Sequence, residues 1–407
     1  MEWKYFMRQL QSSPHSQVLI CMIAALGFLW LPPALAVEEE VEKVKSEIRM
    51  VKEMVQENMK EVPPSQEAKK EKPELVAMPI PVANPTVGAG LAVAGMLLYK
   101  ASENAPTSNT TVGGLYTTND TWGMGISQNT YLFGDRFRLN GIAGYLNLNL
   151  DFSGIGSERG IEGVTVPITE KGYGFWSDFL YRFANHFYGG IRYRYLDFKS
   201  VVDPQKITVE GQPIFPEVDF VAESRVRSSG IGLLMNYDSR DNTFYPYRGT
   251  FLDVNALFAD TALGSDFDYQ IYQGAYNTYF SITEKITLAY RFYGRITDGR
   301  VPLYDLSYFG EHNDLRGYAA GTFVDKMMLA TQLEFRWRFW KRLGMVAFGG
   351  VGKVGRDWDD LDGQDLLPSV GVGLRFMASK KERVNLSIDY ARGREEDAFY
   401  FYIGEAF

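Results

Sequence analysis

The sequence predicts an all-β protein that crosses a membrane as an antiparallel β-barrel of about sixteen strands. Three observations lead to this fold class. From about residue 86 onward, apolar and polar side chains alternate with a period of two, the pattern of strands with two unlike faces. The apolar faces are rich in aromatic residues, of which the chain holds 7 Trp, 25 Tyr and 27 Phe. The first 36 residues read as an export signal and no long apolar helix follows them, so a closed barrel remains the way to cross a bilayer.

The composition excludes several other classes of protein. The chain has 407 residues, of which 45% are apolar and 23% charged, and this excludes a disordered chain. A single Cys excludes a disulfide scaffold and a multi-Cys zinc site, and three His argue against a His-rich metal centre. The net charge of −8 argues against a nucleic-acid partner. We therefore expect no metal, no cofactor and no nucleic acid.

Residues 1–36 have the layout of a secretory signal peptide. Lys4 and Arg8 give a weakly positive start, residues 18–31 are apolar, and an Ala-Leu-Ala triplet ends at Ala36. We expect cleavage after Ala36. The alternative is a retained membrane helix, but the apolar run is shorter than the roughly 20 residues that a span needs.

Residues 37–62 predict a short coiled-coil helix. Apolar residues recur at alternating spacings of four and three, at Val37, Val41, Val44, Ile48, Val51 and Val55. This is a heptad seam, and its β-branched residues favour three or more helices over two. Glu40 and Glu47 fall where a parallel partner would present Lys45 and Lys52. We expect this segment to form a homo-oligomer in the periplasm; the alternative is a single solvated helix.

Residues 63–85 combine six prolines with charged residues, which indicates a stiff, extended linker. Its later part, residues 75–83, has the length of one barrel crossing, about 9–11 residues. Two prolines make this a poor ladder strand, which suits a weak junction in the wall. We assign it as the first strand, because the pattern of turns and loops requires one crossing before residue 86.

The barrel itself is predicted to occupy residues 86–407. One face of residues 331–340 carries the apolar side chains Leu333, Phe335, Trp337 and Phe339. About fifteen such segments follow one another, and bacterial single-chain barrels have even strand numbers. With the first strand added, the count becomes sixteen. Short turns such as 185–186 are expected at the periplasmic rim, and long loops such as 200–221 and 299–325 outside.

The polar faces of several strands carry arginines that should point into the barrel lumen. These residues are Arg192, Arg194, Arg291, Arg295, Arg336 and Arg338. One interpretation is an electropositive interior that attracts anionic clients. The other is a structural network in which acids such as Asp298, Asp305 and Asp314 neutralise the arginines. Both interpretations stay open at the level of the sequence.

Three ordered motifs resemble the bacterial surface antigen family, the superfamily of the outer-membrane assembly barrels BamA and TamA. Residues 237–249 resemble its periplasmic turn, and residues 309–318 resemble its inward-folded sixth loop with an Arg-Gly-Tyr tip. The last nine residues resemble its C-terminal barrel signal, carried by Phe401, Ile403, Gly404 and Phe407. The resemblance implies a sixteen-strand barrel in the outer membrane with a weak seam between first and last strands.

The resemblance also implies that this loop is locked inside the barrel. In relatives the loop arginine meets acids on the next two strands, which assigns Arg316, Gly317 and Tyr318 to the tip and Glu334 to the first acid. Losing one member of such a buried pair costs about 3–5 kcal/mol. The sequence departs from the family at the second acid, since Gly350 occupies that position. An ordinary solvated loop arginine is the alternative.

The resemblance leaves the function open. Relatives carry POTRA domains before the barrel, whereas residues 37–74 are too few for one, so the chain looks like a branch without them. The leading hypothesis is a factor that helps other polypeptides enter or cross the outer membrane. The alternatives are a passive channel and a tethering barrel oligomerised by its coiled coil. We expect no catalysis, because the acids and Ser residues near His186 and His312 are common and no G-x-S-x-G occurs.

A peptide of residues 37–62 tests the coiled coil. We expect its helical circular dichroism to grow with peptide concentration, because association stabilises the helix. A control peptide with Val44→Ser and Val51→Ser, which interrupts the apolar heptad positions, should stay unfolded. A coil spectrum that does not change up to high micromolar concentration would favour the single solvated helix.

Overall fold

The computed structural model describes residues 72–84, 88–152, 164–209, 211–214, 217, 221–309, 314–318, 322–394 and 396–407. The chain divides into two units, Met1–Lys72 and Pro73–Phe407, and the second unit is the barrel. The expected signal peptide and coiled coil lie outside the described residues, as does the first part of the linker. No helix within the described ranges is long and apolar enough to cross a membrane.

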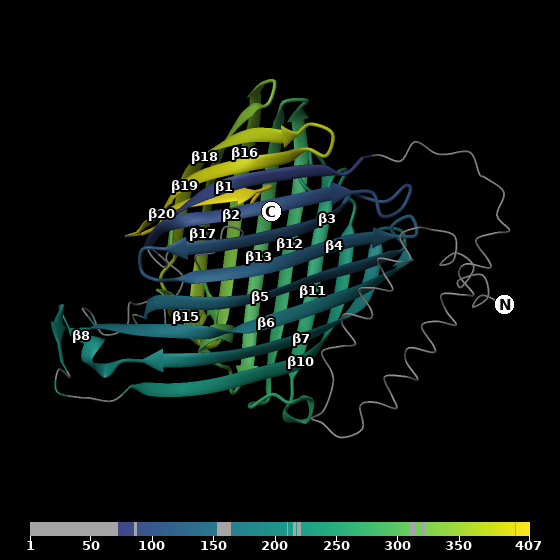
Figure 1. Cartoon of the computed structure of the whole chain (residues 1–407). Coiled ribbons are helices and arrows are strands. Elements are labelled where there is room, and N and C mark those ends of the chain that lie inside the picture. Colours follow the sequence, from purple (N-terminus) through teal and green to yellow (C-terminus); the bar gives the residue numbers. More distant parts are fainter. Residues whose placement is uncertain are drawn as a thin grey trace. The chain divides into compact units, whose positions relative to one another are not determined.

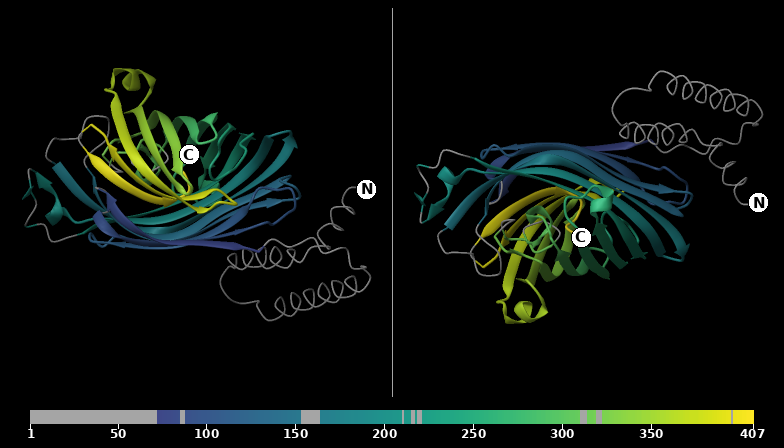
Figure 2. Two further views of the ribbon diagram at one scale, coloured as in Figure 1. Left: turned by 90° about the horizontal axis from the view of Figure 1, so that it is seen from above. Right: turned by 90° about the horizontal axis from the view of Figure 1, so that it is seen from below.

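Sixteen antiparallel strands form the wall of the barrel, as predicted (Figure 1). The large sheet has 18 strands, and two of these, β8 and β9, are two-residue additions, which leaves 18 − 2 = 16. The wall consists of β1 (Glu74–Asn84), β2 (Gly88–Tyr99), β3 (Ser108–Thr117), β4 (Trp122–Leu132), β5 (Phe137–Phe152), β6 (Val164–Ala184), β7 (Phe187–Val202), β10 (Ala222–Asp238), β11 (Gly249–Ala259), β12 (Tyr269–Thr283), β13 (Ile286–Gly299), β16 (Met327–Trp340), β17 (Leu343–Gly355), β18 (Leu367–Ser379), β19 (Val384–Arg392) and β20 (Asp397–Ile403). Each strand pairs with the next in chain order, and β20 returns to β1, so that yellow and purple strands adjoin in Figure 2.

Alternation along the strands separates an apolar outer face from a polar lumen. On β16, Leu333 and Phe335 are 48% and 39% exposed, whereas Glu334 and Arg336 between and after them are 0% exposed. The same outward band on other strands is rich in aromatic side chains, among them Trp122, Tyr145, Phe179, Phe280, Phe292 and Phe399. An apolar outer band with aromatic residues is the surface that a lipid bilayer requires.

The strands differ in length around the barrel. β6, β7 and β10 have 21, 16 and 17 residues and extend beyond the others at the lower left of Figure 1. Smaller elements occupy the connections: η1 (Pro204–Lys206), β8 (Thr208–Val209), β9 (Gln212–Pro213), η2 (Thr261–Leu263), η3 (Leu303–Asp305), β14 (Ser307–Tyr308), β15 (Val324–Asp325) and α4 (Trp358–Gly363). The loop expected at 200–221 therefore begins with the end of β7 and contains two short strands, of which β8 pairs with β6.

The first and last strands of the barrel, β1 and β20, differ from what the sequence predicts in opposite ways: β1 pairs more regularly, and β20 ends earlier. β1 forms an unbroken ladder of 11 residues with β2, at the place where a poor first strand was expected. The last strand, β20, ends at Ile403, before the end of the predicted barrel region at Phe407. Gly404 has a φ of 106°, and its N–H donates to the carbonyl oxygen of Asn385 at 2.8 Å. The left-handed conformation at this glycine turns the following residues away from the ladder.

Candidate functional site

The loop between β13 and β16 folds into the barrel and ends in a clamped arginine. Arg316 is 0% exposed. Its Nη2 lies 2.7 Å from Oε2 of Glu334 on β16, and its Nη1 lies 2.5 Å from Oδ2 of Asp389 on β19. Its guanidinium carbon lies 3.4 Å from the centre of the Phe348 ring on β17. One side chain thus joins the loop to three strands through charge-assisted hydrogen bonds and a cation–π contact.

Two further arginines and one further acid balance the charges around this clamp. Arg336 Nε lies 2.7 Å from Oε1 of Glu334. Arg375 Nη1 lies 2.5 Å from Oδ1 of Asp389, and its Nε lies 2.8 Å from Oε2 of Glu405. Three guanidiniums meet three carboxylates, and none of these side chains is more than 3% exposed. Because water does not reach the network, removal of one member leaves an uncompensated buried charge.

The residues after the arginine dock the loop tip through their main chain and one ring. The N–H of Gly317 donates to the Tyr400 hydroxyl on β20 at 2.8 Å. The hydroxyl of Tyr318 donates to the carbonyl oxygen of Pro368 on β18. Gly317 has a φ of 101°, and a Cβ there would lie 2.7 Å from the nitrogen of Gly393. Only glycine allows this backbone conformation and this close approach together.

Glycines on β17 and β18 make room for the loop and its partners. A Cβ at Gly350 would lie 3.1 Å from Cδ1 of Leu315, a loop side chain that is 0% exposed. A Cβ at Gly373 would overlap Oδ1 of Asp389 and lie 2.8 Å from Nη1 of Arg375. Gly350, the position at which the family pattern has its second acid, is therefore packed against the loop. Asp389, two strands further along the wall, supplies the second carboxylate instead.

A second ion pair holds the start of the same loop. Asp305 of η3 accepts from Arg194 on β7, with Oδ2 2.5 Å from Nη2. Burial acts to raise the pKa of Asp305, but the charge of Arg194 outweighs it and the pKa is lowered. In chain order β7 is the seventh wall strand and β19 the fifteenth of sixteen. The ionic partners of Asp305 and Arg316 therefore include strands eight positions apart in a wall of sixteen.

Most of the six arginines assigned to the lumen bind an acid or a loop carbonyl. The contacts are Arg192 with Asp178, Arg194 with Asp305, Arg336 with Glu334, and Arg295 with the carbonyl oxygen of Asp305. Arg338 lies nearer the short-turn rim, where its Nη1 donates to the Tyr247 hydroxyl at 2.7 Å. Arg291 donates to Asn277 at 2.9 Å and has no carboxylate within ion-pair distance among the described residues. Paired charges thus outnumber unpaired ones, which favours the structural network over an electropositive interior.

The terminal motif divides between the wall and the lumen. Phe401 and Ile403 belong to β20, whereas Gly404 begins the inward turn. The carbonyl oxygen of Phe407 accepts from Nη2 of Arg336 at 2.9 Å, so the last residue reaches the clamp network.

Asp389 and Arg375 were not identified from the sequence as members of this network. Their positions on inward faces of alternating strands were the available signal, since a charge there needs a partner in the lumen.

The wall is weakest between its first and last strands. β1 and β20 share one register pair, Ala83 with Phe399, although β1 pairs with β2 along 11 residues. Pro79 and Pro81 in β1 lack an N–H. Because the ladder to β2 is unbroken, the missing donors fall on the edge that faces β20. A hollow of 120 Å³ between the two strands is lined by residues 80–82 and 399–402.

The histidines considered for catalysis are not gathered into a reactive group. Nδ1 of His186 lies 2.9 Å from the carbonyl oxygen of Asp238, and His312 lies outside the described residues. Within the described ranges, no three His, Cys, Asp or Glu side chains are placed to hold a metal ion. The two features that stand out in the barrel are instead the loop fixed by the ion pairs of Arg316 and the junction of β1 and β20, which has one register pair.

Comparison with known proteins identifies relatives of this barrel. Residues 108–407 match the Omp85 superfamily domain. Among solved structures, the chain is similar to BamA from Haemophilus ducreyi lacking POTRA domains 1–3, with 15% identity, 81% of this chain and 69% of that chain covered, and a TM-score of 0.53.

Two structures of CdiB are also similar. For CdiB from Acinetobacter baumannii the identity is 12%, the coverage 81% of this chain and 59% of that chain, and the TM-score 0.50. For CdiB from Escherichia coli the values are 10%, 83%, 63% and 0.53. The chain thus spans less than two thirds of either CdiB, and these identities support a common fold. A search of curated proteins gave no significant match.

Replacement of Arg316 tests the clamp. Arg316→Ala leaves Glu334 and Asp389 short of a cation, and we expect a loss of about 3–5 kcal/mol of stability. The variant should lose heat resistance on gels, and added protease should cut the loop faster. Glu334→Gln should act in the same direction but more mildly, because an amide still accepts a hydrogen bond. The double variant should cost less than the sum of the two, and strict additivity would contradict a direct pair.

Substitution of Gly373 tests the close packing beneath the clamp. Gly373→Ala should destabilise the barrel by about 1–3 kcal/mol, because its Cβ would overlap the Asp389 carboxylate. Gly274→Ala on β12 is the matched control, since no atom lies within 4 Å of a Cβ there. Thermal unfolding in detergent measures both. Equal melting temperatures would mean that the Asp389 side chain moves aside without cost.

Proposed function

The chain belongs to the Omp85 superfamily, whose barrels reside in the outer membrane, and from this premise we propose that it helps other polypeptides insert into or cross that membrane. The observation that carries the proposal is the seam, where a single residue pair joins β1 to β20. In this function the chain forms and breaks main-chain hydrogen bonds with the client polypeptide, and no catalytic step is involved.

An incompletely paired strand edge in a bilayer attracts another strand. Each backbone group left without a hydrogen bond in hydrocarbon costs several kcal/mol. β1 cannot fully satisfy β20, because Pro79 and Pro81 offer no N–H on the facing edge. An extended client segment with ordinary residues can supply those donors by adding to the exposed edge. The client segment would then pair with the edge of β20, and β1 would later pair with that edge again.

The clamp gives the seam one rigid side. Asp389 lies on β19, and it also accepts from the Tyr402 hydroxyl of β20 at 2.6 Å. Arg375 ties β18 to the same carboxylate. The last three strands are therefore joined to the inner loop, whereas Glu74 at the start of β1 accepts one hydrogen bond from Ser379 at 2.8 Å. We infer that the β1–β2 hairpin moves and that β18–β20 stay in place.

A passive channel is the competing function. Asp305 and Arg316 of the inner loop are held by buried ion pairs inside the barrel, so solutes would have to pass around these parts of the loop. A tethering role would depend on residues 37–62, which lie outside the described residues, and stays a prediction. Conductance across a lipid bilayer and assisted insertion of a barrel substrate, measured on one purified sample, separate channel from assembly factor.

A disulfide across the seam tests the proposal. Ala83→Cys with Phe399→Cys places two thiols at the paired seam positions, in a chain whose one native Cys, Cys21, precedes the barrel. We expect the oxidised protein to lose assisted insertion of a barrel substrate into liposomes and to regain it with reductant. The matched control is Met78→Cys with Ala94→Cys, a register pair within the β1–β2 hairpin, which should stay active in both states. Full activity of the oxidised seam variant would contradict the proposal.

A further inference from the structure

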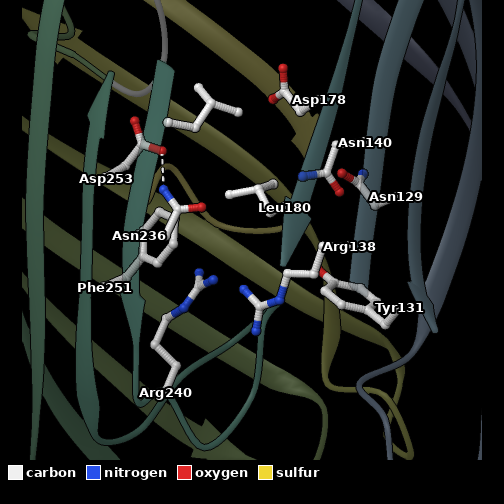
Figure 3. Close-up of a pocket in the computed structure, with 11 residues that line it drawn as sticks. Asn129, Tyr131, Arg138, Asn140, Asp178, Leu180, Asn236, Arg240, Phe251 and Asp253 are labelled. Atoms are coloured by element: carbon white, nitrogen blue, oxygen red, sulfur yellow. Dashed lines mark hydrogen bonds between the residues drawn. The ribbon is translucent and has the colours of Figure 1, made fainter. Parts of the chain in front are cut away.

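A separate hollow lies in the lumen wall, away from the clamp and the seam (Figure 3). Side chains of β4, β5, β6, β10 and β11 and of the turn after β10 line it, and its volume is 180 Å³. A space of this size holds several water molecules or one small organic molecule, and it is below the roughly 300–1,000 Å³ of pockets for larger ligands. The charges on its walls decide between these occupants.

One end of the hollow is cationic. Arg138 is fixed by two hydrogen bonds of 2.8 Å to Asp135 and by a third of 2.9 Å to Asp238. Arg240 uses its Nε and Nη2 to bind Asp238, and its guanidinium carbon lies 4.1 Å from the centre of the Phe251 ring. The remaining nitrogen of Arg240, Nη1, makes no hydrogen bond to any described residue. This guanidinium is held in place with one donor edge unused.

The other end is acidic. Asp253 accepts from Asn236 at 2.5 Å and from Asn255 at 2.7 Å, and no cation of the described residues lies within ion-pair distance of it. Asp178 stands at the same end, paired with Arg192. Figure 3 shows Asp178 and Asp253 above, and Arg138 and Arg240 below, with Leu180 and Asn236 between the two groups.

The charges in and directly behind the walls do not cancel. Three arginines are present, Arg138, Arg192 and Arg240, and four carboxylates, Asp135, Asp178, Asp238 and Asp253. The sum is 3 − 4 = −1, and the unpaired charge is that of Asp253. A shielded carboxylate without a cation is costly, so an occupant that brings a cation to Asp253 is favoured.

We propose that this hollow binds a small zwitterion, a free amino acid or dipeptide. Its ammonium group would pair with Asp253, and its carboxylate would accept from Arg240 Nη1. The amides of Asn129 and Asn140, which line the side of the hollow, suit the peptide group of a dipeptide. An anion alone leaves Asp253 uncompensated, and a cation alone faces two guanidiniums, so one molecule with both charges satisfies both ends.

Titration calorimetry on the full chain in detergent tests this inference, with glycylglycine as the probe. N-acetylglycine keeps the carboxylate without the ammonium group, and glycinamide keeps the ammonium group without the carboxylate. We expect saturable binding of glycylglycine, and affinity at least tenfold lower for each of the other two. This comparison needs no variant of the protein.

Substitutions then locate the site. Asp253→Asn preserves size and hydrogen bonding but removes the charge, and should weaken glycylglycine binding at least tenfold. Asp298→Asn, which removes an exposed carboxylate at the end of β13, is the matched control and should bind as the unaltered chain does. Equal affinity for glycylglycine and N-acetylglycine would overturn the inference in favour of a simple anion site. Absence of saturable binding would overturn it in favour of a water-filled hollow.

Discussion

The pairing of Arg316 with Glu334 and Asp389 is the interaction on which the rest of the barrel interior depends. A guanidinium without access to water is tolerable only when carboxylates and hydrogen bonds surround it. Those two carboxylates in turn require Arg336 and Arg375. If the loop left the lumen, Glu334 and Asp389 would stay buried without Arg316 as a partner. The position of the loop and the charge balance of the network therefore depend on each other.

The same constraint explains features that look unrelated along the chain. Gly350 and Gly373 lie on different strands, yet each makes room for an atom of the loop or of the network. The inward turn at Gly404 brings Glu405 to Arg375, which completes the charge balance. Small residues in the wall and an early end of the last strand are thus consequences of burying one arginine.

The clamp and the seam divide the barrel into a fixed part and a loosely joined part. Every other junction of the wall carries seven or more register pairs, whereas the junction of β1 and β20 has one. Further pairing would need N–H groups that Pro79 and Pro81 lack. Since a bilayer penalises unpaired backbone, the site of weakness is also the site where another strand gains most by binding.

The alternation of faces and the number of wall strands could be predicted from the chain alone, because a period of two and the order of turns and loops are local patterns. The pairing of Arg316 with Glu334, 18 residues apart, was implied by the resemblance of the loop motif to a known family. The tertiary structure alone decided that Asp389 meets Arg316, because 73 residues separate them and only barrel closure brings β19 to the loop. The end of β20 and the unpaired charge of Asp253 were decided in the same way, since each depends on which inward side chains meet across the lumen.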